Sequence, residues 1–272
     1  MKFADLHIHS YFSDGTFSPK EIVKEALRAG LDCISITDHD TIAGIDPVIK
    51  EATGTLEIIP GIEMTAEISG QEVHILGYFI DYRDKDFLQM LEKMQEARTK
   101  RIYGICEKLK KLKVDIEPES IFALAGKGSI GRLHVARALV EKGCCSSVSE
   151  AFVRYIGDRG PAYVGKLKMT PAETIKWIKK VKGIPVLAHP FTLGSRFIIS
   201  DFVKDGIMGI EAYYAEHSDF QEQEFIKIAK KYDLLITGGS DCHGEAKDEI
   251  NMGKIKLPYE YVEKLKEARG NV

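Results

Sequence analysis

Residues 3–10 of this chain read Phe-Ala-Asp-Leu-His-Ile-His-Ser. Apolar and polar residues alternate in this stretch, which predicts a buried strand over residues 3–9. Because successive side chains of a strand point to opposite faces, Asp5, His7 and His9 share one face. Two imidazoles on one face can bind one metal ion, but they can equally be core histidines bonded to the backbone. A His-x-His pair by itself leaves both alternatives open.

Composition restricts the class of protein. With 272 residues, the chain can form one large domain, or one domain with an insertion. Its apolar content of 44% and charged content of 29% are ordinary for a globular protein. The net charge of −3 provides no general basic field, so we expect no DNA-binding surface and no attraction to membranes. Any anion must therefore be bound by a local cluster of cationic groups.

The start of the chain and its cysteines bear on its location. The first predicted strand begins at residue 3, so we expect no signal peptide, and no apolar run approaches the length of a membrane span. The cysteines are odd in number and form no Cys-x-x-Cys pair: Cys33, Cys106, Cys144, Cys145 and Cys242. We therefore expect reduced thiols in a cytoplasmic protein.

Strand and helix patterns alternate over residues 1–84 and again over residues 166–272. The stretches 18–21 (Ser-Pro-Lys-Glu) and 170–173 (Thr-Pro-Ala-Glu) are capping boxes with proline at the first helical position, so each begins a helix. Seven strands are predicted, at residues 3–9, 32–37, 56–63, 72–79, 184–189, 207–212 and 233–238. We expect all but the fourth to be parallel, which is typical of α/β architecture with sites at the carboxyl ends of strands. The count is one short of an eight-stranded barrel.

Residues 85–165 break this alternation. Four helical stretches follow one another there without a strand of comparable strength, at about 85–112, 118–125, 132–142 and 147–157. We interpret the segment as an inserted helical subdomain that packs over the rim of the barrel and caps the site there. The barrel domain would then comprise residues 1–84 and 166–272.

Residues of metal-binding types occur at or just after the ends of the predicted strands. Six of the eight histidines and three carboxylates take such positions: His7, His9, Asp14, His39, Glu63, His74, His189, Asp241 and His243. Imidazole together with carboxylate is a donor set that suits manganese, zinc or iron. Since one ion takes about four to six ligands, nine ligands at one rim predict two or three divalent metal ions that share a bridging carboxylate.

Four blocks of this sequence resemble the polymerase-and-histidinol-phosphatase (PHP) superfamily. They are Asp-Leu-His-Ile-His at 5–9, Thr-Asp-His-Asp-Thr at 37–41, Gly-Ile-Glu at 61–63 with Val-His at 73–74, and Ser-Asp-Cys-His at 240–243. The resemblance covers nearly the whole chain, and the joint match of the blocks is highly specific. It implies a distorted seven-stranded (β/α) barrel with a helical insertion, which agrees with the strand count.

The resemblance also sorts the nine candidate ligands, which spacing alone does not. By that similarity one ion would be held by the residues that would also carry catalysis, His7, His9, Glu63 and Asp241. A second ion would be held by Glu63, His74 and His189, with Glu63 as the bridge, and a third by Asp14, His39 and His243. The neighbouring Asp5, Asp38 and Asp40 are better interpreted as groups that orient the imidazoles.

A candidate anion site lies at residues 129–134, Ser-Ile-Gly-Arg-Leu-His, at a predicted helix start. A helix N-terminus with arginine and histidine nearby suits a phosphate, although a solvated helix face is the alternative. One PHP subgroup resembles this chain in having an Arg-x-His block in the insertion and an arginine after the His-Pro block. By that similarity Arg132, His134 and Arg196 would bind substrate phosphate. Here His-Pro is followed by Phe191, where a glycine is common.

Other residues allow two interpretations each. Tyr163 and Tyr213 could stack on a nucleobase or pack in the core. Lys166 and Lys168 could add positive charge, although exposed lysines are the default. His217, at a predicted helix start, is interpreted as a solvent-facing or capping residue.

The resemblance implies a metal-dependent phosphomonoesterase, in which water activated by the metal ions attacks phosphorus without a covalent phospho-enzyme. The subgroup implies a small nucleotide substrate, a nucleoside 3′,5′-bisphosphate that loses its 3′-phosphate, and short RNA trimmed from its 5′ end as a further substrate. A histidinol-phosphate phosphatase is the alternative enzyme, since it shares the barrel. A metal-poor structural PHP domain is the non-enzymatic alternative, but all nine ligand positions are filled here.

Overall fold

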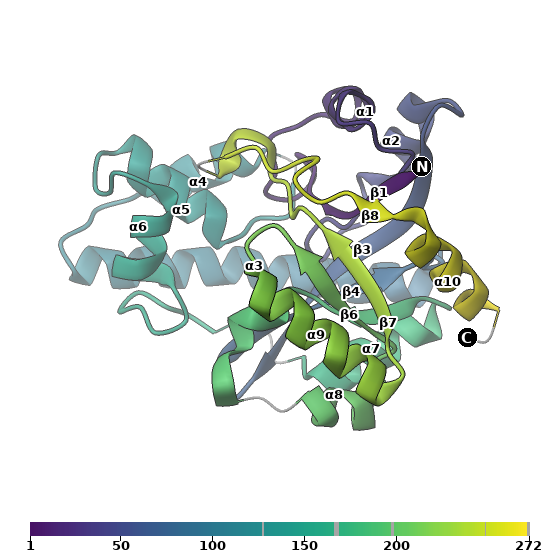
Figure 1. The fold of residues 1–272 in the computed structure, drawn as a ribbon. Coiled ribbons are helices and arrows are strands. Elements are labelled where there is room, and N and C mark those ends of the chain that lie inside the picture. Colours follow the sequence, from purple (N-terminus) through teal and green to yellow (C-terminus); the bar gives the residue numbers. More distant parts are fainter. Residues whose placement is uncertain (127, 166–168, 197–198, 248, 271–272) are drawn as a thin grey trace.

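The computed structural model describes residues 1–126, 128–165, 169–196, 199–247 and 249–270, with backbone alone for residues 194–196 (Figure 1). Its strands are β1 (Phe3–Ile8), β2 (Cys33–Ile36), β3 (Glu57–Ile68), β4 (Gln71–Tyr78), β5 (Ile184–Leu187), β6 (Gly209–Tyr214), β7 (Leu235–Gly239) and β8 (Leu257–Pro258). Its α-helices are α1 (Pro19–Arg28), α2 (Ile45–Ala52), α3 (Lys85–Lys111), α4 (Pro118–Ala125), α5 (Arg132–Glu141), α6 (Val148–Ala151), α7 (Pro171–Lys180), α8 (Ile199–Asp205), α9 (Asp219–Tyr232) and α10 (Tyr259–Arg269). Shorter helical turns are η1 (Phe152–Ile156), η2 (Pro190–Arg196) and η3 (Gly244–Ala246).

The strands form one sheet in the order β7-β6-β5-β4-β3-β2-β1-β8. Within β1 to β3 and within β5 to β7 the neighbours are parallel, whereas β4 is antiparallel to both β3 and β5. The sheet curls until its ends meet, because Ile8 of β1 pairs with Cys242 after β7 and the His9 amide donates to the Cys242 carbonyl at 2.9 Å. A distorted α/β barrel with seven main strands is thereby confirmed, including the exceptional direction of the fourth.

One strand was not predicted from the sequence. β8 has only two residues and pairs antiparallel with the start of β1. A stretch so short carries no periodicity, so only the paired neighbour reveals it. The two capping boxes, in contrast, are present as predicted at Ser18 and Thr170, each with proline in the first turn.

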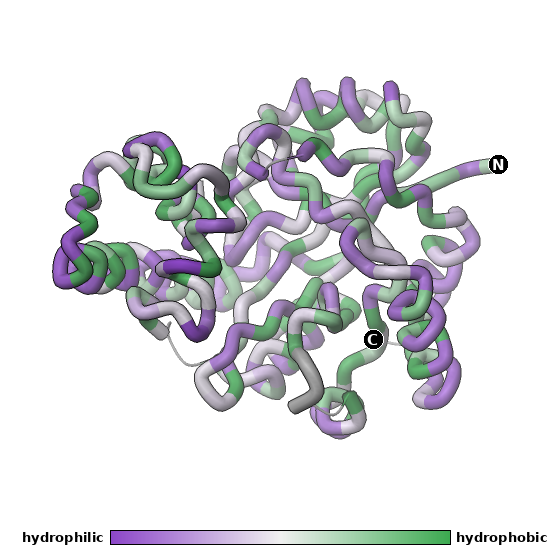
Figure 2. Tube along the Cα trace, turned by 60° about the vertical axis from the view of Figure 1, so that its left-hand side comes forward, coloured by the Kyte–Doolittle hydropathy of each residue, from purple (hydrophilic) through white to green (hydrophobic). Residues whose placement is uncertain are grey.

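Helices cover the barrel with their apolar faces, and the tube in Figure 2 shows hydrophobic and hydrophilic residues alternating along them. The strand residues that point outward, such as Ile62, Ile75 and Ile210, join a cluster with buried side chains of α3 and α7. None of the described helices combines the length and the apolar character that a bilayer span requires.

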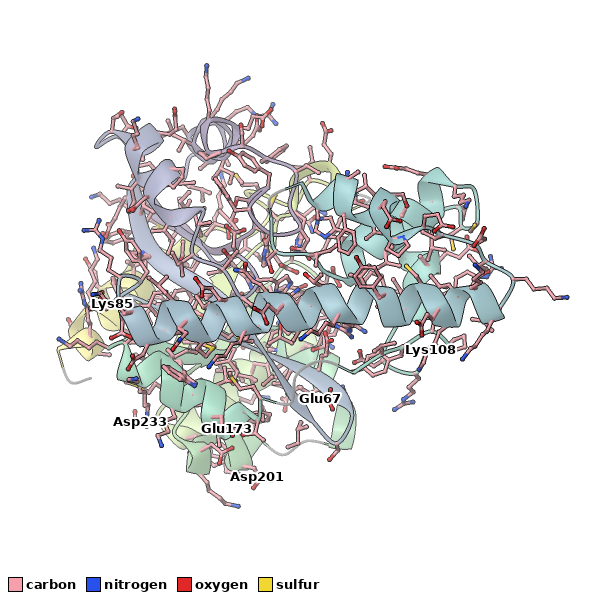
Figure 3. All side chains as sticks on the ribbon, turned by 180° about the vertical axis from the view of Figure 1, so that it is seen from behind. Glu67, Lys85, Lys108, Glu173, Asp201 and Asp233 are labelled. Atoms are coloured by element: carbon pink, nitrogen blue, oxygen red, sulfur yellow. The ribbon has the colours of Figure 1, made fainter. Side chains whose placement is uncertain are left out.

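A second group of helices lies beside the barrel: α4, α5 and α6 gather to one side of the strands (Figure 1). They have a hydrophobic cluster of their own, which includes Ile121, Val135 and Leu139. The long helix α3 joins the two parts and runs along the back of the molecule from Lys85 to beyond Lys108 (Figure 3). The first half of α3 packs in the hydrophobic cluster that contains Ile62 and Ile75 of the barrel. Its second half packs in the cluster that contains Ile121 and Leu139 of the helical part.

Gly239 at the end of β7 provides a test of the barrel closure. A Cβ on Gly239 would lie 2.5 Å from the backbone nitrogen of His7, closer than real Cβ contacts allow. We predict that Gly239→Ala lowers the free energy of unfolding by about 1–3 kcal/mol, because β7 must move away from β1. Gly104→Ala is the control, since its Cβ would lie 3.4 Å from Val164 within a helix that alanine favours. Urea denaturation measures both variants, and equal stabilities would contradict the close approach.

Candidate metal centre

The nine residues predicted as ligands converge at one end of the barrel. β1 and the loop after it provide His7, His9 and Asp14. Two of the remaining residues lie within β3 and β4, and the others follow the ends of β2, β5 and β7: Glu63, His74, His39, His189, Asp241 and His243. All are buried except His74, which is half-buried. The parallel strands account for this, because their carboxyl ends meet at one rim. His74 arrives differently: β4 is antiparallel to β3, and its His74 pairs with Thr65, two residues beyond Glu63.

The carboxylate of Glu63 lies at the centre of this group. Five imidazole nitrogens surround it within 3.3 Å: Nε2 of His7, Nε2 of His9, Nδ1 of His39, Nδ1 of His74 and Nε2 of His189. The first three lie against one carboxylate oxygen and the last two against the other. Such a carboxylate can bridge two ions, one at each oxygen.

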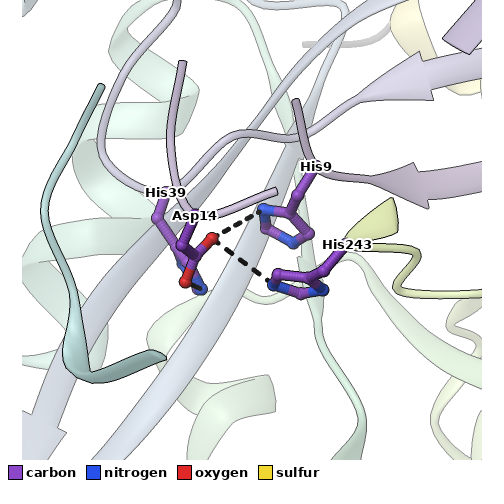
Figure 4. A group of neighbouring side chains, drawn as sticks. All are labelled: His9, Asp14, His39 and His243. Carbon is purple, nitrogen blue, oxygen red and sulfur yellow. Dashed lines mark ion pairs between the residues drawn. The ribbon is translucent and has the colours of Figure 1, made fainter. Parts of the chain in front are cut away.

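Asp14 and Asp241 stand on either side of His243. Asp14 lies 3.4 Å from His243 Nε2 and 3.7 Å from both His9 Nδ1 and His39 Nε2 (Figure 4). Oδ1 of Asp241 lies 3.1 Å from His9 Nε2 and 3.5 Å from His243 Nδ1. His9 and His243 stack with ring centroids 4.2 Å apart, so both carboxylates face the same pair of rings.

The donor atoms fit divalent cations. Among the described residues, His7 Nε2, His9 Nε2, His39 Nδ1 and Asp14 Oδ1 are buried and form no hydrogen bond, although each lies close to an atom of opposite charge. Buried polar atoms left without a partner are destabilising, and coordination to a cation would satisfy them. Donor atoms lie within 4.8 Å of one another in three groups: His7, His9, Glu63 and Asp241; His9, Asp14, His39 and His243; and His39, Glu63 and His74.

These groups can be compared with the sets implied by the family resemblance. The first has the same members, and the second adds His9 to Asp14, His39 and His243. The third has His39 in place of His189, although His189 Nε2 lies 3.0 Å from Glu63. His9 and His39 each belong to two of these groups, so each could bind an ion at either of two neighbouring sites.

The electrostatics keep the acids charged. Burial by itself would raise the pKa of Glu63, but His39, His74 and His7 hold that pKa well below its usual range. The pKa values of Asp14 and Asp241 are also held well below the usual range against burial, by neighbouring histidines and, for Asp241, first by Lys247. Burial lowers the pKa of His39 well below its usual value. Against burial, the neighbouring carboxylates raise the pKa of His7, and raise those of His9 and His74 to about 9. Because charged carboxylates and neutral imidazoles are the forms that bind metal ions, cation binding at these three rings would displace protons.

A carboxylate that the sequence analysis did not assign supports two candidate ligands. Oε1 of Glu211, in β6, lies 3.0 Å from His7 Nδ1, and its Oε2 accepts a hydrogen bond from the His189 amide at 2.8 Å. Partners of this kind fix ring orientation and raise ligand basicity. The signal in the sequence is an acid inside the buried strand Gly-Ile-Glu-Ala-Tyr-Tyr, but only the fold reveals which rings it meets.

The three aspartates beside the ligands were expected to orient imidazoles. Asp38 does so through a hydroxyl, because Ser13 Oγ donates to it at 2.6 Å and lies 3.4 Å from His9 Nδ1. Asp5 accepts from the amides of His7 and Ser240, and Asp40 receives the Arg98 guanidinium at 2.6 Å. Asp5 and Asp40 thus hold the backbone and helix α3 around the site.

A cavity of about 680 Å³ opens over the candidate ligands. The helical part contributes Arg98, Arg101, Arg132 and Phe152 to its wall, and the barrel contributes Phe191, Tyr214 and Lys247. Arg132 donates to Asp158 at 2.6 Å and to Glu72 at 2.7 Å, and Arg101 lies 2.5 Å from the other oxygen of Glu72. Arg101 and Glu72 were not singled out by the sequence analysis, since neither carries a motif.

Of the other predicted phosphate-binding residues, only His134 has a side chain that the structure describes. The ring of His134 is buried, its Nδ1 accepts from the Gly131 amide at 3.1 Å, and it is not among the described residues that line the cavity. The structure therefore gives His134 a capping contact at the start of α5. The side chain of Arg196, and both Lys166 and Lys168, lie outside what the structure describes.

Tyr163 and Tyr213 do not line the cavity in the described structure either. Arg101 and Arg132 lie over the Tyr163 ring at 5.4 and 5.6 Å, and the Tyr213 hydroxyl pairs with that of Tyr261. Both rings therefore pack against neighbouring side chains, which agrees with the second of the two interpretations given above.

Comparison with known proteins identifies this arrangement. The model of the PHP domain matches residues 5–155. This chain belongs to the PHP family. The 5′-3′ exoribonuclease of Haemophilus influenzae is 34% identical to this PHP protein over 245 residues, which cover 88% of this chain and 89% of the relative. The 3′,5′-nucleoside bisphosphate phosphatase of Chromobacterium violaceum is 27% identical and is aligned over 92% of this chain and 90% of the relative.

A solved structure from Bifidobacterium adolescentis, named as a metal-dependent phosphoesterase, matches with a TM-score of 0.88 and 29% identity, over 97% of this PHP chain and 95% of the other. The family expected from the four sequence blocks is thereby confirmed. With the cluster of candidate ligands, these similarities show that the PHP chain is a metal-dependent phosphoesterase, a hydrolase of phosphate ester bonds.

The role of Glu211 can be tested by metal affinity. We predict that Glu211→Gln weakens metal binding about 10- to 100-fold with the fold retained, because Gln cannot hold His7 and His189 as a charged acceptor does. Competition with a chelator, followed by elemental analysis, measures the affinity. Glu224→Gln on the exposed face of α9 is the control and should bind metal like the wild type. Equal affinities for all three proteins would contradict the role of Glu211.

The capping contact of His134 predicts a pH dependence of stability. Burial lowers the pKa of His134 to about 4, so between pH 6.5 and 4 the unfolded chain binds a proton that the folded chain excludes. The contribution of His134 to the free energy of unfolding is therefore full above pH 6.5 and decreases as the pH falls. At pH 4.5 the decrease from this group is roughly 2 kcal/mol. His134→Gln keeps an acceptor for the Gly131 amide but does not titrate. Urea unfolding at pH 6.5 and 4.5 should show a smaller loss for the variant, and equal losses would contradict the account.

Proposed function

We propose that this phosphoesterase removes the 3′-phosphate from nucleoside 3′,5′-bisphosphates. The observation that carries the proposal is the short path from Arg132 to the candidate metal centre along β4. The Arg132 guanidinium bonds Oε2 of Glu72, which lies 3.7 Å from His74 Nε2, and His74 lies 2.9 Å from Glu63. Arg132 and the candidate metal centre line one cavity, which supports a substrate with one phosphate at each of them.

In this proposal His7, His9, Glu63 and Asp241 hold one ion, and these residues carry catalysis. Glu63, His74 and His189 hold a second ion, and Asp14, His39 and His243 a third. Divalent ions of manganese, zinc or iron bound there would supply Lewis-acid stabilisation of phosphoryl charge and lower the pKa of water. Glu63 stays ionised between two positions, and Glu211 keeps His7 and His189 aimed at them.

Arg132 anchors the other phosphate of the substrate. Its guanidinium is nearly buried and is already held in place by Glu72 and Asp158. A phosphate dianion that binds there replaces one of these carboxylates or shares the guanidinium with them, so no free side chain has to become ordered. Arg101, on the second oxygen of Glu72, adds positive charge beside it. Residues 85–165 act in this proposal as a helical subdomain that caps the active site of a barrel domain comprising 1–84 and 166–272.

Short RNA trimmed from its 5′ end is a second candidate substrate. The similarity to the exoribonuclease of Haemophilus influenzae over most of both chains favours it. The geometry required is the same: the 5′-terminal phosphate is at Arg132 and the next phosphate along the chain is at the metal centre. A histidinol-phosphate phosphatase is the weaker alternative, because its small substrate has one phosphate and leaves Arg132 without a role.

Parallel assays of phosphate release with manganese test the proposal. Adenosine 3′,5′-bisphosphate should be hydrolysed with a higher kcat/KM than either histidinol phosphate or adenosine 3′-monophosphate. Arg132→Ala should raise KM for the bisphosphate roughly 10- to 100-fold, which reflects the loss of a charged hydrogen bond, and should change the monophosphate far less. Arg154→Ala, which removes an exposed arginine paired with Glu150, is the control.

A preference of the wild type for histidinol phosphate would overturn the choice of substrate. Unchanged kinetics of Arg132→Ala on the bisphosphate would show that the arginine is not the anchor.

A further inference from the structure

An aromatic wall lies on the barrel side of the cavity. Phe191, two residues after His189, lines the cavity and is half-buried. Its ring lies 5.6 Å from that of Tyr214, which in turn lies 5.5 Å from the imidazole of His189. The Phe191 ring is therefore one aromatic ring removed from a candidate metal ligand.

Neighbouring groups hold the Phe191 ring in place. The Tyr214 hydroxyl donates to Oδ2 of Asp241 at 3.0 Å. On another side, the ring of His217 meets Phe191 edge to face at 5.3 Å. His217 Nδ1 bonds the Ala212 carbonyl at 2.8 Å, and its ring packs on Phe225. The expectation that His217 faces solvent or caps α9 is wrong, since it packs behind Phe191 and Ser218 is the cap. A ring braced in this way loses little conformational freedom when a ligand stacks on it.

The other aromatic side chains of the cavity already have partners. Of the three among the described lining residues, Tyr214 is buried with its hydroxyl engaged, and the guanidinium of Arg132 lies over the Phe152 ring at 5.6 Å. Phe191 is the third, and its partly exposed ring has no role in the centre described above.

The charges of the cavity indicate what meets that ring. The lysines that line the cavity, Lys247 and Lys254, are paired with Asp241 and Glu249. The lining arginines are paired as well: Arg98 with Asp40, Arg101 with Glu72, and Arg132 with Glu72 and Asp158. Every lysine and arginine among the described residues that line the cavity therefore has a carboxylate partner. A flat, neutral group suits this wall better than an anion does.

We propose that Phe191 is the stacking platform for the nucleobase of the substrate. The proposal rests on the proposed function, since the two phosphates at Arg132 and the metal centre leave the base as the neutral, flat part of the nucleotide. Stacking tolerates every base because each has a π-face, so this platform selects nucleotides over other phosphate esters without selecting a sequence.

The test compares substrates with and without a base. KM is measured for adenosine 3′,5′-bisphosphate and for the abasic 1,2-dideoxyribose 3′,5′-bisphosphate, with manganese-loaded wild type, Phe191→Ala, Phe191→Leu and Phe191→Tyr. The ratio of the abasic to the adenosine KM should fall about 5- to 100-fold in Phe191→Ala, with kcat for the adenosine compound changed less than KM. Phe191→Tyr should preserve this ratio of KM values. Phe191→Leu should lower it, because leucine fills space but has no π-face.

An unchanged ratio in Phe191→Ala would overturn the platform while leaving the proposed function intact. If the wild type hydrolyses neither bisphosphate, the proposed function fails separately, and calorimetric binding of adenosine 5′-monophosphate decides the role of Phe191. Weaker binding by Phe191→Ala than by wild type supports the platform, and equal binding overturns it.

Discussion

Five imidazoles converge on the carboxylate of Glu63, and the rest of the site depends on that convergence. A buried carboxylate is unstable without compensation, and here the surrounding histidines hold its pKa well below the usual range. The same crowding leaves ring nitrogens of His7, His9 and His39 buried without hydrogen-bond partners among the described residues. A protein interior rarely retains such atoms, so cations that bind both the rings and the acids would stabilise the arrangement.

The barrel makes this convergence possible because it places distant segments at one rim. His9 and His243 are far apart in the sequence, yet the bond from His9 to the Cys242 carbonyl joins their backbones where the sheet closes. The antiparallel β4 connects the metal centre to the helical part. Its side chains Glu72 and His74 share one face, so His74 lies at the metal centre while Glu72 binds Arg132. Helix α3 supports this connection by packing in both hydrophobic clusters.

Local patterns in the sequence were sufficient for the main strands, the capping boxes and the residues that gather at the rim, because strand ends and metal-binding residue types are both local features. The remaining features arise only from folding. Glu211 looks like an isolated acid in an apolar strand, Glu72 carries no motif, and Phe191 is one aromatic residue among many. His134 matched a family pattern, but its ring turns back to the Gly131 amide, an orientation that residue order does not determine.

Anomalous diffraction at the manganese edge, from crystals grown with manganese, tests the central claim most directly. The account predicts two or three anomalous peaks within bonding distance of the nine side chains, with Glu63 bound to two of them. Diffraction that shows the same side chains in place with no peak among them, or peaks only elsewhere on the protein, would contradict it.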